Sequence, residues 1–200
     1  MFSDYFNQSI FKRAQQKKVI EIKTHNLRDY AQDKHLTVDQ PPYGGGPGMV
    51  LMVEPIARAV QNIKTEKKAR VILFSAGGEK FNQKTAQRLA RYQQLILICG
   101  RYEGVDERVA QKIADEEISL GDFILSGGEL PAMMLVEAVA RFVPGVLGAK
   151  ESLETIKGSY PVYTRPEIFN SWKVPKVLLS GNHQKIAAWR EKMKKKTLDN

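Results

Sequence analysis

The sequence predicts an α/β fold in which a parallel β-sheet is covered by helices on both faces. Two observations lead to this prediction. Apolar runs of strand length, VILFS (71–75) and LILIC (95–99), alternate with helical segments between residues 50 and 145. Strands of this composition are buried on both faces, as in parallel sheets. Glycine-bearing segments follow the runs, and ligands bind beyond the carboxyl ends of parallel strands.

The elements follow from hydrophobic periodicity and from the residues that begin and end helices. Helices are predicted in chain order at 3–16, 54–63, 83–93, 105–113, 129–143 and 184–195. Strands are predicted at 18–24, 71–75, 95–99 and 117–120. Asn82 is a candidate helix cap, and Pro144 with Gly145 should end the longest helix. Three of the strands end in glycine-bearing loops, so these loops should meet in one pocket.

The charge is basic, with 31 Lys and Arg against 22 Asp and Glu and a net charge of +9. A basic surface binds polyanions by releasing counterions, so nucleic acid is the leading partner class. A basic enzyme with a solvated face explains the charge equally well. No apolar run approaches the roughly 18 residues of a membrane span, and no signal peptide is visible, so we expect a cytoplasmic protein.

Several familiar sites are excluded. One cysteine and three well-separated histidines make a zinc site improbable. The motifs of Rossmann, P-loop, zincin and α/β-hydrolase sites are absent. Glycine-rich segments remain at YGGGPG (43–48), GRYEG (100–104) and GDFILSGGELP (121–131), the last two with Glu103 and Asp122 beside the turn. Glycine lets a backbone approach a ligand closely, although a tight turn also explains YGGGPG.

Long blocks of the sequence resemble the bacterial tRNA (guanine-37-N1-)-methyltransferases (TrmD family). They read HLTVDQPPYGGGPGMVLMVEPI, LILICGRYEGVDERV, EEISLGDFILSGGELPAMMLVEAVARFVPGVLG, and YTRPEIF followed by VPKVLLSGNHQKIAAWR. The resemblance covers roughly Met1 to Arg190. It implies an enzyme of the SPOUT class, with a deep trefoil knot in the sheet and S-adenosylmethionine bound in the knot. It also implies a tRNA substrate and a homodimer with the active site at the subunit interface.

The resemblance divides the chain into three parts. It implies a knotted methyltransferase domain at 1–148, a flexible linker at 149–165 and a truncated C-terminal tRNA-binding extension at 166–200. The family continues beyond the last helix of this chain. It also begins with an apolar strand before the position of Met1 and Phe2. Because that strand is absent here, we expect translation to begin upstream of Met1.

The resemblance also assigns functional residues. Those expected to bind the cofactor are Ser75, Gly100, Glu103, Leu120, Gly121, Asp122, Phe123, Ile124 and Leu125. Those expected near the tRNA are Asp39, Tyr43, Gly44, Gly48 and Ser152, to which the basic end of the chain adds Lys192 and Lys194 as phosphate contacts. The resemblance also implies that Mg²⁺ takes part, but it assigns no protein ligands to the ion.

The expected chemistry needs a base and a cation. Guanine N1 carries a proton that a carboxylate must accept, and the charge that develops on O6 needs a positive partner. Arg141 matches the arginine at the target guanine, although its ordinary role would be an ion pair late in a helix. The linker lacks the family's aspartate, so Glu154 is the expected base and Glu151 the second choice.

Two other functions stay open at this point. One is an RNA- or cofactor-binding relative that has lost catalysis together with the linker aspartate. The other is a SPOUT methyltransferase that acts on a different RNA site.

Overall fold

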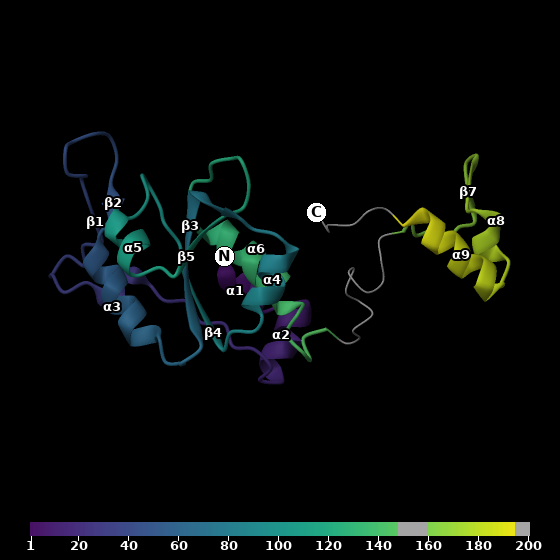
Figure 1. Cartoon of the computed structure of the whole chain (residues 1–200), viewed down its shortest axis with the longest axis horizontal. Helices are drawn as coiled ribbons and strands as arrows, with labels where there is room; N and C mark the ends of the chain where they lie inside the picture. Colours follow the sequence, from purple (N-terminus) through teal and green to yellow (C-terminus); the bar gives the residue numbers. More distant parts are fainter. Residues whose placement is uncertain (148–159, 195–200) are drawn as a thin grey trace. The chain divides into compact units, whose positions relative to one another are not determined.

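The chain forms two compact units, Met1–Leu147 and Gly148–Asn200, which we call unit 1 and unit 2 (Figure 1). The structure, a computed structural model, describes residues 1–147 and 160–194. Each unit is described by itself below.

A three-stranded parallel sheet forms the centre of unit 1. The strands are β3 (Ala69–Lys80), β4 (Gln94–Ile98) and β5 (Glu116–Ser119), in the order β4-β3-β5. The central strand β3 is therefore hydrogen-bonded on both sides. The predicted parallel α/β sheet is confirmed, whereas the trefoil knot stays a prediction.

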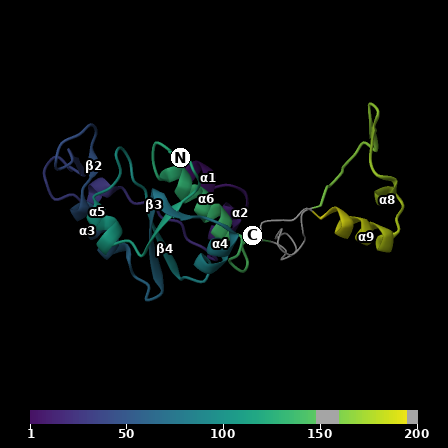
Figure 2. The same ribbon diagram turned by 45° about the horizontal axis from the view of Figure 1, so that its top comes forward.

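Helices cover both faces of this sheet, as predicted (Figure 2). Successive side chains of a strand point to opposite faces. Val71 and Leu73 pack with α3 (Val53–Ile63) and α5 (Glu107–Lys112) on one face. Ile72 and Phe74 pack with α4 (Gln83–Leu89) and α6 (Glu129–Ala140) on the other. A continuous apolar run thus supplies two separate cores.

Two of these helices end earlier than the periodicity predicts. The start of α4 is as expected, since Asn82 Oδ1 accepts a hydrogen bond from Thr85 N at 3.0 Å. The helix ends at Leu89 because residue 93 donates its N–H to Lys68 O and so enters the sheet region. In α6 the last turn tightens to i→i−3 bonds, with Val143 N donating to Ala140 O at 3.0 Å.

The N-terminal predictions were partly wrong. The expected helix over 3–16 is two helices, α1 (Phe2–Phe6) and α2 (Ser9–Gln16), because Ser9 has a positive φ of 49°. This bend brings the rings of Phe6 and Phe11 to 5.1 Å, and both are buried. The expected strand over 18–24 is not a strand, because no described strand pairs with it and alternation alone supplies no hydrogen-bond partner. Its apolar side chains instead pack beside α1 and α2.

The first buried strand also differs from its prediction, because β3 does not end at Ser75. Its pairing with β5 jumps from Phe74 to Glu79, both of which lie opposite Ile118. Residues 75–78 therefore form a bulge within the strand. Gly78 permits the bulge, since an added Cβ would lie 2.7 Å from the backbone of Glu117 and Ile118.

The remaining elements are short. In unit 1, η1 (Leu27–Tyr30) precedes the antiparallel pair of β1 (Asp39–Gln40) and β2 (Val50–Leu51). Unit 2 has an antiparallel hairpin of β6 (Ile168–Phe169) and β7 (Trp172–Lys173), followed by α8 (Lys176–Leu179) and α9 (His183–Met193). Within the described ranges, none of the helices has both the length and the apolar character to span a bilayer.

An ion cluster joins the amino ends of the sheet. Glu116 of β5 accepts from Arg70 Nε of β3 at 2.8 Å and from Arg88 Nη2 of α4 at 2.6 Å. Burial raises the pKa of Glu116, but the hydrogen bonds from Arg88 and Arg70 outweigh it and leave this pKa below its ordinary value. The cluster therefore ties a helix and two strands together through one carboxylate.

Replacing this carboxylate should weaken the fold. We expect Glu116→Gln to lower the free energy of unfolding by about 1.5–3 kcal/mol, the range for hydrogen bonds to charged groups. Because the pKa of Glu116 is lower in the folded chain, its contribution is complete above the ordinary carboxyl pKa and is lost as the pH falls through the folded value. Urea unfolding of both proteins at decreasing pH measures this. The exposed Glu66→Gln is the control, and a difference that does not depend on pH would contradict the assignment.

Candidate functional site

The loops after β4 and β5 meet at the carboxyl edge of the sheet. We call them the β4 loop (99–105) and the β5 loop (120–128); Figure 1 shows both at the same end of β3. Gly128 N donates to Gly100 O at 2.9 Å, and Arg101 forms an antiparallel bridge with Gly127. Arg101 Nε also donates to Glu129 Oε1 at 2.6 Å. Of the three loops predicted to meet, these two do; the third, at 76–78, is not a loop but part of the β3 bulge.

The two loops approach so closely that one position requires glycine. A Cβ added to Gly128 would lie 2.7 Å from Cys99 Cα and 3.1 Å from Gly100 N. Cys99 itself is packed at this junction. Burial raises the pKa of its thiol to about 12, with a further contribution from the Glu129 carboxylate. A thiol in this state is not a nucleophile near neutral pH, so Cys99 packs the junction.

The glycine-rich loop (43–48) is attached to the same edge. The residue that follows it, Met49, accepts a hydrogen bond from Glu103 N at 3.1 Å, and Leu51 N donates to Gly104 O at 3.1 Å. A Cβ added to Gly48 would lie 2.5 Å from Glu103 Cγ. Two residues that were predicted for different ligands, Glu103 and Gly48, therefore lie against each other.

The carboxylate of Glu103 is available to a ligand. It is exposed, and it forms none of the ion pairs found within 1–147 and 160–194. Asp122 differs, because its carboxylate accepts from Lys80 Nζ at 2.6 Å. Of the two acids that stand beside glycine turns, Glu103 is the one open to a cation from outside.

The β5 loop presents apolar side chains outward. Phe123, Ile124 and Leu125 are 55, 89 and 39% exposed. Ser119 Oγ holds the start of the loop, donating to Gly121 O at 3.1 Å and accepting from Gly121 N at 3.3 Å. The loop thus has three consecutive exposed apolar residues after a turn that hydrogen bonds fix. A flat apolar ligand or another protein surface would cover such side chains.

Ser75 and Leu120 complete the predicted cofactor set at this edge. Ser75 begins the bulge of β3, and Leu120 begins the β5 loop. Because β3 lies between β4 and β5, the bulge lies between the strands that precede the two loops. All the predicted cofactor residues thus belong to this edge of the sheet.

Arg141 lies elsewhere. It follows the last residue of α6, about 18 Å along the helix axis from Glu129, at 1.5 Å per residue. Its Nη1 is 3.7 Å from Glu137 Oε1, and Tyr5 Oη donates to the other oxygen of Glu137 at 2.9 Å. The structure therefore places Arg141 in a helical ion pair, away from the joined loops of the same chain.

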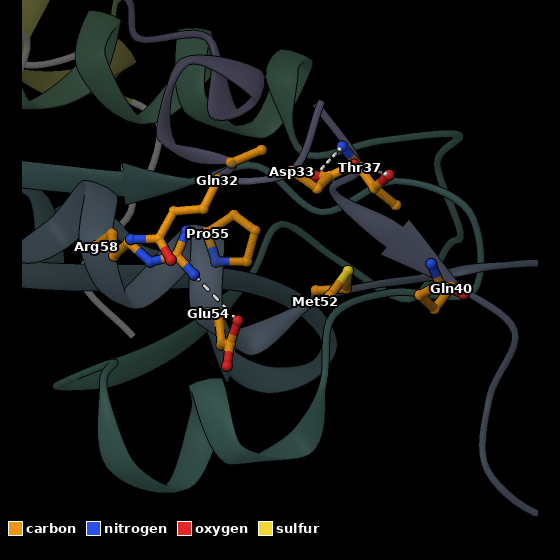
Figure 3. Close-up of a pocket in the computed structure, with 9 residues that line it drawn as sticks. Gln32, Asp33, Thr37, Gln40, Met52, Glu54, Pro55 and Arg58 are labelled. Atoms are coloured by element: carbon orange, nitrogen blue, oxygen red, sulfur yellow. Dashed lines mark hydrogen bonds and ion pairs between the residues drawn. The ribbon is translucent and has the colours of Figure 1, made fainter. Parts of the chain in front are cut away.

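A hollow that the sequence did not predict lies beside β1 (Figure 3). Its volume is about 330 Å³, and its lining consists of Ala31, Gln32, Asp33, Thr37, Gln40, Met52, Glu54, Pro55 and Arg58. Its charged groups are paired locally: Asp33 accepts from Thr37 Oγ1 at 2.7 Å, and Arg58 donates to Glu54 at 3.0 Å. No known motif marks these residues, and the predicted cofactor residues are not among those that line the hollow.

The residues predicted near the tRNA are spread over several segments. Asp39 lies in β1, next to Gln40 of the hollow, whereas Tyr43 is fully exposed and Gly44 has a φ of 86° in the glycine-rich loop. Lys192 and Lys194 lie at the end of α9 in unit 2, where Lys194 Nζ contacts Glu191 at 2.6 Å. Glu151, Ser152 and Glu154 lie outside the described residues.

The described residues do not gather three or more His, Cys, Asp or Glu side chains in a metal-binding arrangement. Mg²⁺ therefore stays a prediction without assigned ligands.

Taken together, these observations define an α/β protein with two joined loops at the carboxyl edge of a parallel sheet, where ligands of such sheets bind. A family model described as tRNA (Guanine-1)-methyltransferase TrmD matches residues 1–200, and the chain belongs to this family. Its relatives include proteins named tRNA (guanine-N(1)-)-methyltransferase from Geotalea uraniireducens (54% identical), Dictyoglomus turgidum (55%) and Dehalococcoides mccartyi (51%). Each match covers 96% of this chain and 80% of the relative. The predicted family is confirmed.

The junction of the loops can be tested by adding one methyl group. We expect Gly128→Ala to lower the free energy of unfolding by about 1–3 kcal/mol, because the new Cβ overlaps the backbone at Cys99. Gly77→Ala is the matched control, since its Cβ would meet only Ser75 Oγ at 3.9 Å. Urea unfolding of both variants makes the comparison, and equal stabilities would show that the loops are not held this tightly.

Proposed function

We propose that this protein transfers a methyl group from S-adenosylmethionine to N1 of guanine 37 in tRNA, beside the anticodon. The observation that supports this best is the junction of the β4 and β5 loops at Gly128, in a chain of the TrmD family. The similar proteins named tRNA (guanine-N(1)-)-methyltransferase support the reaction and the substrate. The enzyme would act in the cytoplasm.

The edge of the sheet fits the proposed cofactor. Gly100 and the backbone of the β5 loop from Leu120 to Leu125 would contact the adenosine, and the exposed apolar side chains of that loop would cover its flat base. Ser75 would form a further wall. Glu103 would pair with the ammonium of the methionine part, because its carboxylate is exposed and forms no ion pair with another described residue. When bound, S-adenosylmethionine supplies an activated methyl group, and a deep trefoil knot would shape this site.

The residues of the chain would supply the rest of the chemistry. Guanine N1 becomes nucleophilic when its proton leaves, and Glu154 would accept that proton, with Glu151 as the second choice. Arg141 would stabilise the negative charge that then develops on O6. The arginine is half-exposed at the end of α6, so it can meet a nucleotide from outside.

The position of Arg141 supports a homodimer. One chain cannot bring this side chain to its own joined loops across about 18 Å of helix, but a second copy related by a twofold axis can present its Arg141 there. The proposed active site therefore lies between two subunits. The tRNA would contact Asp39 and Tyr43–Gly48 near this site, Ser152 in the linker, and Lys192 and Lys194 in unit 2.

A mixing experiment tests the shared site. Arg141→Ala removes the positive charge that would stabilise O6, and Gly121→Val places a side chain in the loop that would bind the cofactor. Each variant alone should therefore lose at least about 99% of the methyl-transfer activity. If each site combines Arg141 of one chain with Gly121 of the other, mixed dimers have one intact site. Co-expression should then restore activity to about one quarter of that of the wild type. Mixtures that stay inactive, while each variant folds and dimerises, would contradict the shared site.

The proposed base gives a separate prediction. Glu154→Gln should lower kcat by about 10²- to 10⁴-fold and leave cofactor affinity unchanged, because only proton acceptance is lost. Glu151→Gln is the matched control and should retain most of the rate. Single-turnover methylation of tRNA measures both variants. If Glu151→Gln is the inactive one, the base is Glu151; if both are active, neither linker carboxylate is the base.

A further inference from the structure

The β6–β7 hairpin holds two aromatic rings side by side in unit 2. Phe169 is paired with Trp172 across the hairpin, with ring centroids 5.8 Å apart and ring planes inclined by 54°. The turn contains only Asn170 and Ser171, and Asn170 adopts a φ of 54° that asparagine tolerates well. Short turns of this kind fix the register of a hairpin, so Phe169 and Trp172 stay opposite each other.

Both rings face outward. Trp172 is 71% exposed and Phe169 is 57% exposed. None of the residues of β6, β7, α8 and α9 is buried. The hairpin therefore does not place these rings in a core of the described part of the unit. Adjacent exposed aromatic rings are the arrangement that proteins use to bind the flat faces of bases.

The net charge of the described part of unit 2 favours RNA as the occupant of this surface. Residues 160–194 contain seven Lys and Arg and two Glu, and Lys173 directly follows Trp172. Unit 1 is also basic, with 20 Lys and Arg against 17 Asp and Glu in Met1–Leu147. A protein occupant from either unit of this chain would bring like charges together, whereas RNA phosphates are complementary to them.

We infer that Phe169 and Trp172 form a stacking platform for an unpaired base of the tRNA. Aromatic side chains bind the flat faces of bases in single-stranded RNA, while neighbouring cations hold the backbone. Bases in a duplex are already stacked, so the platform selects a loop over a stem. The inference rests on the proposed function for its substrate. It adds a contact that helps to orient the tRNA but takes no part in methyl transfer.

Affinity for tRNA tests the platform in the full chain. We expect Trp172→Ala to weaken binding of a tRNA transcript about 5- to 150-fold, the range for loss of one stacked base, and Phe169→Ala to weaken it in the same range. Trp172→Phe should recover most of the affinity. Val162→Ala is the control, because its side chain is also exposed in unit 2, and it should bind as the wild type does.

The salt dependence separates stacking from phosphate contacts. The slope of log affinity against log salt should stay unchanged in Trp172→Ala, because no phosphate contact is lost. In Lys192→Ala the slope should decrease by about one unit. An unchanged affinity in both aromatic variants would overturn the inference, as would a loss of affinity that is wholly a change in salt slope.

Fluorescence gives a direct readout, since the chain has two tryptophans, Trp172 and Trp189. In the Trp189→Phe variant, the emission of Trp172 should be quenched by an anticodon stem-loop RNA and not by a blunt duplex of the same stem. Equal quenching by the duplex would overturn the platform. So would a Trp172→Ala variant that loses stability or dimerisation while it binds tRNA normally, because the ring would then pack on protein. If the wild type does not bind tRNA or methylate it, the proposed function itself fails.

Discussion

The structure of unit 1 depends on β3, which is hydrogen-bonded to parallel strands on both sides. Parallel pairing forces the carboxyl ends of β4 and β5 to the same edge, and it leaves helices to cover both faces. The loops after these strands then meet at this edge, where the contact between Gly128 and Cys99 allows no side chain. The proposed cofactor site is thus a consequence of strand order, and its tightness is a consequence of one glycine.

The length of α6 connects the proposed reaction with the proposed homodimer. Its first residue, Glu129, is bound to Arg101 of the β4 loop, so the beginning of α6 is part of the joined loops. Its end bears Arg141, which the helix keeps about 18 Å away. A rigid helix therefore separates two groups that the proposed reaction needs together. The proposed homodimer would unite them in a site between two subunits.

Much of the sheet could be predicted because its signals are local. The apolar run LILIC marks a doubly buried strand, and Asn82 marks the start of a helix, as the structure confirms. The failures are non-local: the 18–24 segment needed a pairing partner, and the β3 bulge depends on contact between Gly78 and β5. For the site, parallel strand order predicted that the loops meet. The contact of Glu103 with Gly48 had no sequence signal, and the residues of the hollow match no motif.

The most direct test of the account is to identify the methylated nucleoside. The full chain would be incubated with methyl-labelled S-adenosylmethionine and a tRNA transcript bearing guanine at position 37, and the product digested for mass spectrometry. We expect the label in 1-methylguanosine at that position, and no label in a transcript with adenine there. Label in another nucleoside, or equal label in both transcripts, would contradict the proposed reaction.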